Sequence, residues 1–333
     1  MTLLIYLGIT LFMGYKAIVT KEVGLGDFAA TFNGASAISN SVFAITSWFA
    51  ISFRENGLYV EKFKRFMNAE EKIINGTDET VYKKPVTIKF ENVSFKYPGT
   101  EKYVLKNINL EISPYKKIAL VGYNGAGKTT LTNLLLRLYD VSDGRITVDG
   151  KDIRDWDIAS YHKNFAAVFQ DFSLFGASLG ENVSMNDTPE KEKVKAALKT
   201  SGFEKELPED TDSILLREFD DNGVSLSGGE AQKIAIARTF YKDCPFAILD
   251  EPSANLDPVA EYNLNQSMSR AADDKTVIFI SHRLSTTVMA DEIFMLENGE
   301  IIEHGSHDEL IALDGKYAYM FRLQAEKYNV KEN

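Results

Sequence analysis

The sequence predicts an α/β fold preceded by an all-α, apolar N-terminal segment. Three features support this prediction. The first fifty-odd residues carry very few charges, whereas the rest of the chain is rich in them. A strand pattern runs straight into a glycine-rich loop and a helical stretch, and a later apolar run ends in two adjacent carboxylates. The 333 residues are enough for about two domains of ~100–200 residues each.

The composition excludes several classes of protein. Hydrophobic residues are 44% and charged residues 26%, as in ordinary globular proteins. The net charge of -11 argues against nucleic acid as the main partner, because a phosphate backbone needs a basic face. Cys244 is the only cysteine, so we expect no internal disulfide and no cysteine-rich metal site. The scattered histidines lack metal-ligand spacing apart from a weak pair at His304 and His307, which we interpret as surface residues.

The N-terminal segment contains two apolar runs. No side chain from Phe28 to Phe53 is ionisable, and a bilayer core of ~30 Å needs about 20 helical residues. Small and polar residues within this run suit a helix packed in a bundle or lining a wet pathway. The earlier run, Leu3 to Val19, is interrupted only by Lys16 and is barely long enough to span. We therefore predict two membrane spans.

Charge predicts the orientation of these spans. Arg54, Lys62, Lys64 and Arg65 follow the second run, so that end should be cytoplasmic and residues 20–27 should face outward. Two alternatives remain open. In the first alternative, residues 3–19 are a signal peptide, although they lack a basic start and a convincing cleavage site. In the other, residues 28–53 form a buried helix of a soluble domain. Residues 54–71 resemble a charged amphipathic helix, and residues 75–85 a polar linker.

After Pro85 the pattern becomes strand-like, and a second strand pattern, Lys117 to Val121, enters a glycine-rich loop at residues 122–129. Glycines let successive backbone amides point at phosphate oxygens, and the helix that follows adds its positive end. Lys128 is suited to neutralise β- and γ-phosphates, and the Thr129 hydroxyl to bind Mg²⁺. We therefore expect ATP to be held by Gly122, Asn124, Gly125, Gly127, Lys128, Thr129 and Thr130.

Two further motifs fit the same chemistry. The apolar run 246–249 ends in Asp250, which can hold Mg²⁺, and Glu251, which can act as a general base toward water. The stretch Leu226–Glu230 places Ser227, Gly228 and Gly229 at the start of a helix, which makes a second anion-binding end. Because one chain already has a phosphate loop, this second end suggests a site shared between two subunits.

In order and spacing these motifs resemble the ABC ATPase family over about residues 86–326. Leu226–Glu230 is similar to the family signature, with Glu230 in place of the usual glutamine. Gln170 is similar to the glutamine of its glutamine loop, and Ser253–Asp257 to its D-loop. The resemblance implies an α/β P-loop NTPase of ABC type, with a RecA-like core, an antiparallel β subdomain and a helical signature subdomain. It also implies roles for individual residues: Glu251, His282, Lys128 and Gln170 in catalysis; Thr129, Gln170 and Asp250 at Mg²⁺; Tyr97 on adenine; Ser227, Gly228, Gly229 and Asp257 at ATP.

The chain departs from the family pattern in places. Asn255 is an extra residue in the D-loop, and residues 218–223 match only the ends of the stretch that precedes the signature in exporters. Tyr97 also has a second interpretation, as a strand-end aromatic residue of the core. Residues 1–71 resemble the last two spans of an exporter membrane domain, so we expect a chain that lacks the first four spans.

The resulting hypothesis divides the chain into a partial transmembrane domain (1–71), a linker (72–85), an ABC ATP-binding domain (86–326) and a tail (327–333). It describes an ATPase subunit of an exporter in the cell membrane, with a cytoplasmic ATPase domain and an unidentified substrate. We expect ATP and Mg²⁺ as cofactors, membrane lipid around the spans and a second ABC subunit as partner. A homodimer is favoured over a heterodimer. An uncoupled ATPase remnant and a soluble ABC ATPase of nucleic-acid or ribosome type remain as alternatives.

Overall fold

The computed structural model describes residues 2–68, 73–217, 223–251, 261–262, 266, 274–281 and 287–329. The chain divides into two compact units, residues 1–72 and residues 73–333.

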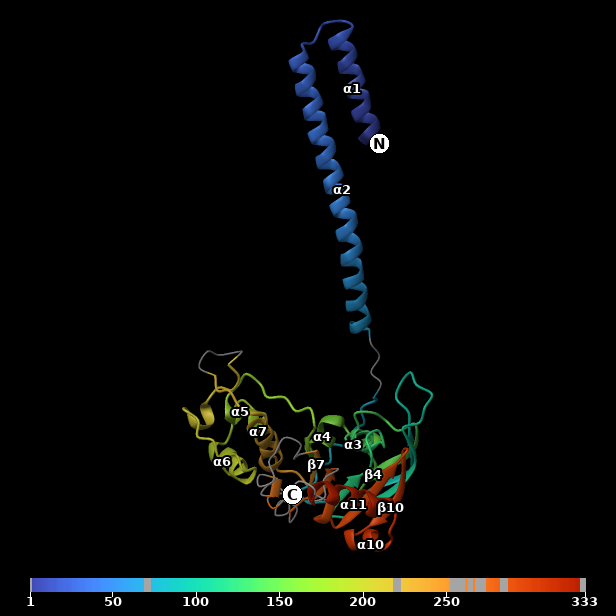
Figure 1. The fold of residues 1–333 in the computed structure, drawn as a ribbon, viewed down its shortest axis with the longest axis vertical. Coiled ribbons are helices and arrows are strands. Elements are labelled where there is room, and N and C mark those ends of the chain that lie inside the picture. Colours follow the sequence, from blue (N-terminus) through green and yellow to red (C-terminus); the bar gives the residue numbers. More distant parts are fainter. Residues whose placement is uncertain are drawn as a thin grey trace. The chain divides into compact units, whose positions relative to one another are not determined.

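The N-terminal unit is a pair of helices, α1 (Thr2–Ile18) and α2 (Leu25–Met67), that pack against each other (Figure 1). The rings of Tyr6 and Phe32 meet across the pair at 5.5 Å between centroids. Hydroxyl groups in α2 bind the helix's own carbonyls one turn back, for example Thr46 Oγ1 to the Val42 oxygen at 2.8 Å. Such bonds satisfy a polar group without water, which suits a helix in an apolar environment. The predicted all-α segment is confirmed.

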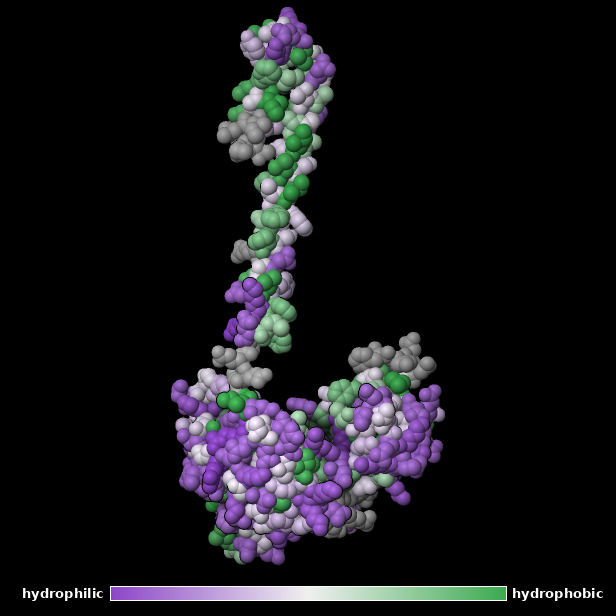
Figure 2. All heavy atoms as spheres, turned by 180° about the vertical axis from the view of Figure 1, so that it is seen from behind, coloured by the Kyte–Doolittle hydropathy of each residue, from purple (hydrophilic) through white to green (hydrophobic). Residues whose placement is uncertain are grey.

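Among the described residues, α2 is the one helix long and apolar enough to cross a membrane by length and composition. It has 43 residues, and Figure 2 shows hydrophobic residues along its middle part. Large apolar side chains such as Trp48 and Phe49 are exposed there. Helix α1 has 17 residues, about 25 Å at ~1.5 Å per residue, which is less than the ~30 Å of a bilayer core. The first of the two predicted spans stays a prediction.

The C-terminal unit contains an antiparallel sheet and a mostly parallel sheet (Figure 1). The antiparallel sheet has the order β2-β1-β4-β5. Alternation of apolar and polar residues sets its register, so that Ile88 and Phe90 of β1 are buried and Lys89 between them is exposed. Its strands are β1 (Ile88–Phe95), β2 (Leu105–Ile112), β4 (Asp143–Val148) and β5 (Lys151–Asp152).

The second sheet has the order β10-β9-β3-β8-β7-β6, parallel throughout except for β10. Strands β7 and β8 are buried along their whole length, as expected for parallel strands covered on both faces. Their carboxyl ends and that of β3 lie at one edge, where α/β proteins bind ligands. The strands are β3 (Lys117–Val121), β6 (Phe165–Val168), β7 (Phe246–Asp250), β8 (Thr276–Ile280), β9 (Glu292–Glu297) and β10 (Glu300–Gly305).

Helices α5, α6 and α7 gather on one side of the C-terminal unit (Figure 1) and share a core that includes Val183, Val194 and Ile234. Helices α10 and α11 pack on β3 and β9 through Leu310 and Tyr317. The predicted α/β fold with an antiparallel and a helical subdomain is therefore confirmed. The helices are α3 (Lys128–Leu135), α4 (Ile158–Lys163), α5 (Leu179–Ser184), α6 (Lys191–Thr200), α7 (Gly228–Tyr241), α10 (His307–Ala312) and α11 (Lys316–Asn329), with 3-10 turns η1 (Ile153–Asp155) and η2 (Asp210–Asp212).

The polar stretch at residues 73–85 lies on the C-terminal unit as a strap. Arg137, just past the end of α3, is almost fully buried and donates to the carbonyls of Ile74 (2.6 Å) and Trp156 (3.0 Å). The Gly76 amide donates to the same Trp156 carbonyl at 2.9 Å. The Trp156 indole in turn donates to the Thr80 oxygen at 3.1 Å. The part of the predicted linker that the structure describes is thus hydrogen-bonded to the domain that follows it. The predicted domain limits themselves stay predictions.

Candidate functional site

The glycine-rich loop joins β3 to α3 at the carboxyl edge of the parallel sheet. Gly122, directly after β3, has φ +147°, and a Cβ there would lie 2.2 Å from the Leu296 carbonyl oxygen of β9. Gly127, the residue before α3, has φ +107°. Both conformations are open to glycine and strained for other residues. The loop therefore keeps its shape only with glycine at these positions.

Lys128, the first residue of α3, folds back over this loop. Its Nζ donates to the carbonyls of Gly122 (2.8 Å) and Tyr123 (3.2 Å), and the side chain is buried. Burial lowers the pKa of its ammonium group, and the charges of Glu251 and Asp250 oppose that shift. A cation held by neutral carbonyls at a helix start is placed to bind phosphate oxygens.

Thr129 and Asp250 meet although they are far apart in sequence. The Thr129 hydroxyl donates to Asp250 Oδ2 at 3.1 Å. Burial raises the pKa of the Asp250 carboxyl, with a further contribution from Glu251, while Thr129 and Lys128 act in the opposite direction. A hydroxyl beside one carboxylate offers the hard oxygen ligands that Mg²⁺ takes alongside substrate phosphates. The described residues contain no cluster of three or more His, Cys, Asp or Glu that could hold a metal alone.

Glu251 follows β7 in a left-handed conformation, with φ +50°. Its amide donates to the Ile280 oxygen (2.9 Å), and its carbonyl accepts from Gln232 Nε2 (3.4 Å). The backbone is thereby held between β8 and α7, and its side chain lines a cavity of about 360 Å³. That cavity is lined by Val104, Asn124, Gly125, Gly127, Lys128, Thr129, Thr130, Gln170, Glu251 and Ile280. Most of the predicted phosphate, metal, base and glutamine-loop residues therefore line one cavity. Gly122 and Asp250 are outside the lining and are joined to it by hydrogen bonds from Lys128 and Thr129.

Tyr97 lies close to this cavity but outside its lining. Its hydroxyl is 3.0 Å from Thr130 Oγ1, and its ring packs edge-on against Phe95 and Tyr139 at 5.0 and 5.3 Å between centroids. The ring is half-buried against the core. Both interpretations of this residue, adenine stacking and core packing, remain compatible with that position.

The signature residues lie at the start of α7, away from the lining of this cavity. Ser227 caps α7: its side chain accepts from the Glu230 amide, and the Glu230 side chain accepts from the Ser227 amide at 2.7 Å. Ser227, Gly228 and Gly229 do not line the cavity that contains Lys128. The two anion-binding helix starts predicted from the sequence, those of α3 and α7, therefore do not share one cavity within a single chain. His282 and Asp257, together with residues 218–222 and the rest of the D-loop, lie outside the described residues.

Comparison with known proteins agrees with this geometry. The family model described as ABC transporter matches residues 105–254, a stretch that includes the glycine-rich loop, the signature and Asp250–Glu251. The chain belongs to the ABC transporter family. Its C-terminal unit is the ATP-binding ATPase domain of that family.

Named relatives of this ABC transporter chain come from several bacteria. An ATP-dependent lipid A-core flippase of Burkholderia orbicola is 40% identical over 243 residues, 72% of this chain and 40% of that protein. A Bacillus subtilis protein, provisionally named a multidrug export ATP-binding/permease protein, is 38% identical over 241 residues, 71% of this chain and 41% of its own length. The chain therefore spans less than half of these relatives.

A solved structure extends the likeness to the N-terminal helices. A bacterial Atm1-family ABC exporter with ATP bound matches with a TM-score of 0.73 and 29% identity. The match covers 97% of this chain and 56% of that one. Because coverage is nearly complete, the likeness includes α1 and α2 as well as the ATPase domain.

Sequence reasoning missed three residues at the site of this ABC transporter chain. Val104 and Ile280 form apolar walls of the cavity, and Gln232 supports the Glu251 backbone. Ile280 ends a buried apolar run, which was a usable signal. No local pattern marks Val104 or Gln232 as site residues. Val104 reaches the site from the residue before β2 and Gln232 from α7, so only the tertiary structure brings them there.

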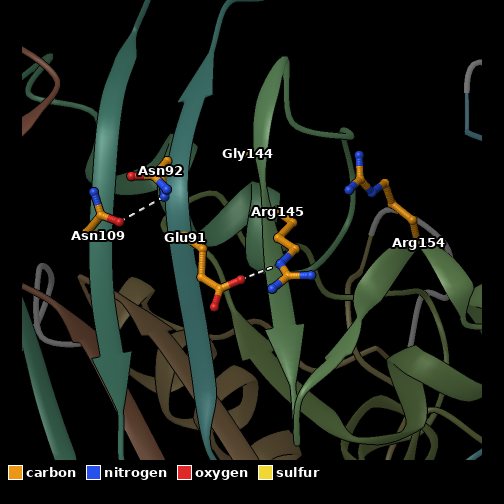
Figure 3. A pocket seen from close by; sticks show the side chains of 6 residues that line it. All are labelled: Glu91, Asn92, Asn109, Gly144, Arg145 and Arg154. Carbon is orange, nitrogen blue, oxygen red and sulfur yellow. Dashed lines mark hydrogen bonds and ion pairs between the residues drawn. The ribbon is translucent and has the colours of Figure 1, made fainter.

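A second depression, of about 580 Å³, lies on the antiparallel sheet (Figure 3). Arg145 points at Glu91 on the neighbouring strand, whereas Arg154 lies apart and pairs with Asp152 at 2.6 Å. Both guanidinium groups thus have carboxylate partners. This open surface lacks the glycine loop and the buried lysine of the first cavity, which remains the candidate site.

Proposed function

We propose that this chain binds and hydrolyses ATP with Mg²⁺ and powers an exporter as its ATPase-bearing subunit. The observation that carries the proposal is that Lys128, Thr129 and Glu251 line one cavity at the carboxyl edge of the parallel sheet, and that Asp250 accepts a hydrogen bond from the Thr129 hydroxyl there. These four come from two segments 121 residues apart in sequence. Because these two distant segments meet at one place, we infer that the four residues act in one reaction centre.

Each residue has a distinct role in this proposal. Lys128 leaves its two carbonyl partners to bind the β- and γ-phosphates, and the loop amides bind the remaining oxygens. Mg²⁺, when bound through Thr129 and Asp250, would offset charge on the phosphates. Glu251 orients a water and accepts its proton as the water attacks the γ-phosphate in line. Gln170, which also lines the cavity, would respond to the γ-phosphate and the ion.

The site is completed by a second subunit. Ser227, Gly228 and Gly229 form an anion-binding helix start that is absent from the cavity of their own chain. A head-to-tail dimer would bring them to the partner's γ-phosphate. His282 and Asp257 are proposed from the family resemblance alone, as a transition-state contact and an ATP contact. Two copies of this chain would make two equivalent sites.

Helix α2 supports the membrane part of the proposal. Its exposed apolar side chains suit lipid, and its polar residues suit a bundle interior or a substrate path. Lys62, Lys64 and Arg65 near its C-terminal end support a cytoplasmic location for that end and for the ATPase domain after it. The relatives' names, lipid A-core flippase and multidrug export protein, lead us to propose an amphipathic cargo.

Phosphate release by the full chain in detergent micelles tests the enzymatic proposal. Glu251→Gln should lower kcat by about 100-fold or more, because a general base contributes ~10²–10⁴. The same variant should retain ATP and form an ATP-dependent dimer in light scattering. Glu101→Gln, which changes an exposed glutamate, is the matched control and should be silent. Turnover of Glu251→Gln at the wild-type rate would show that Glu251 is not the base, and equal activity of wild type and Lys128→Ala would refute the site.

Solubility and transport test the membrane proposal. A chain that is monodisperse without detergent would favour the soluble ATPase alternative. In vesicles containing this chain, ATP-dependent accumulation of a fluorescent lipid or drug supports coupled export. Hydrolysis without accumulation of any tested cargo would support the uncoupled ATPase instead.

A further inference from the structure

The signature helix carries a carboxylate where an anion is to bind. Glu230 is the third residue of α7, and its Oε2 accepts from the Ser227 amide at 2.7 Å. The Ser227 amide is the main cause that lowers the pKa of Glu230; burial opposes it, and Lys205 lowers the pKa further. The side chain is therefore charged at neutral pH. Glutamate at this position places a negative charge at the start of the helix, on the Ser227 amide that directly precedes Gly228 and Gly229.

A negative charge at this place has two opposite effects. It stabilises the helix, because the N-terminal end carries a positive partial charge. It also repels any phosphate that approaches the same end, because like charges in a partly desolvated site interact more strongly than in water. A site for the γ-phosphate at this helix start therefore needs a compensating cation.

Lys205 supplies that cation from a different part of the helical subdomain. It lies in the loop after α6, and its Nζ donates to Glu230 Oε2 and to the Ser225 carbonyl, both at 3.1 Å. The ion pair is partly shielded, with side-chain exposures of 34% for Lys205 and 29% for Glu230. The two contacts join the chain entering the signature to the first turn of α7.

We propose that Lys205 is a positioning residue for ATP hydrolysis, which neutralises Glu230 so that the start of α7 can accept the γ-phosphate bound by a second copy. This inference rests on the proposed function, since it needs a shared ATP site. Lys205 acts through Glu230 and the shape of the signature and does not touch the reacting atoms. With Lys205 paired to Glu230, the start of α7 carries no net negative charge from this position, as it would with an uncharged side chain at position 230.

Other lysine–carboxylate pairs of the same subdomain lack this placement. Lys195 of α6 pairs with Asp210 at 2.6 Å, with side-chain exposures of 46% and 64%. Among the described residues, neither Lys195 nor Asp210 hydrogen-bonds to Ser225, Ser227 or Glu230 at the start of α7. Lys195→Met is therefore a matched control: it removes one lysine charge and one ion pair from the same subdomain.

A double-variant cycle on the full chain in detergent micelles tests the proposal, with phosphate release measured against Mg²⁺–ATP concentration. Lys205→Met should raise KM for ATP by about tenfold, the scale expected when one partly screened charge is uncovered near a phosphate. In a Glu230→Gln background the same change should alter KM by less than about twofold, because no charge is left to uncover. Lys205→Arg should keep most of the wild-type affinity, and Lys195→Met should match wild type.

Each outcome decides one question. An equal rise in KM in both backgrounds would show a purely structural role for Lys205 and overturn the inference, as would no rise in either. Should Lys205→Met fail to fold, Lys205→Gln in the same two backgrounds carries the test. A wild-type chain with no turnover above Lys128→Ala would refute the proposed function itself, which keeps the two failures distinct.

Discussion

Replacing Arg137 by leucine should destabilise the ATPase domain and release the strap at residues 73–85. The Arg137 side chain is 1% exposed and makes three hydrogen bonds: to the Ile74 and Trp156 carbonyls and to Asp140 Oδ1 at 3.1 Å. A net hydrogen bond to a charged group contributes about 1.5–3 kcal/mol. Leucine still fills part of the space with apolar atoms. Once the strap is released, the Ile74 carbonyl can bind water in place of Arg137.

The lower limit of that range, taken for the two bonds other than the one to Ile74, gives a loss of about 3 kcal/mol. This agrees with the ~3–5 kcal/mol found when one partner of a buried pair is removed. For a domain of this size that corresponds to a fall in Tm of about 6–12 °C. Differential scanning fluorimetry of the chain in detergent measures it. Hydrogen exchange should also speed up at Gly76, whose amide is bound to the Trp156 oxygen.

Arg154→Leu is the matched control, because that guanidinium is 44% exposed and pairs with Asp152 on the surface. Exposed pairs contribute about 0–1 kcal/mol, so its Tm should fall by no more than about 4 °C. A Tm for Arg137→Leu equal to that of Arg154→Leu would refute the reasoning. Unchanged exchange at Gly76 would show that the strap is held without Arg137.

Three further substitutions test Asp250 and Tyr97, which lie next to the cavity. Asp250→Asn should raise the Tm of the nucleotide-free chain while abolishing Mg²⁺-dependent hydrolysis. Burial raises the pKa of Asp250, so the folded state binds this proton more tightly than the unfolded chain does; the stability it contributes is present at low pH and is lost as pH rises through the folded-state pKa. A Tm for Asp250→Asn below wild type at pH 8 would contradict this. Tyr97→Phe removes the 3.0 Å contact to Thr130 and should cost about 1 kcal/mol with KM unchanged. Tyr97→Ala should raise KM for ATP about tenfold if the ring stacks on adenine, and an unchanged KM would favour its core role.

Much of the fold followed from local patterns. The uncharged run from Phe28 and the charged residues after it form one continuous helix, α2, because neither stretch contains proline, the residue least tolerated inside a helix. The buried strand before Asp250 and the glycine loop before Lys128 lie where their spacing predicted. Such features depend on neighbours a few residues apart, which a single sequence displays directly.

The strap and the Lys205–Glu230 pair could not be inferred in this way. Residues 75–85 have the polar composition of a free linker. Yet backbone groups of Ile74, Thr80 and Tyr82 in the strap bind the side chains of Arg137, Trp156 and Asn164, respectively. Backbone groups are the same in every residue, so composition carries no record of where they bind. Lys205 and Glu230 are 25 residues apart, and a lysine in a loop has many possible partners.

Residue types and spacing alone were enough to identify the phosphate loop, the adjacent carboxylates and the signature, because each motif works through groups within a few residues of one another. Their assembly was decided by the parallel sheet. Strands β3, β8 and β7 lie side by side, so the Thr129 hydroxyl reaches Asp250 at 3.1 Å. The sheet also leaves Ser227, Gly228 and Gly229 outside that cavity. The physical reason is register: hydrogen bonding between distant strands places side chains that no local pattern connects.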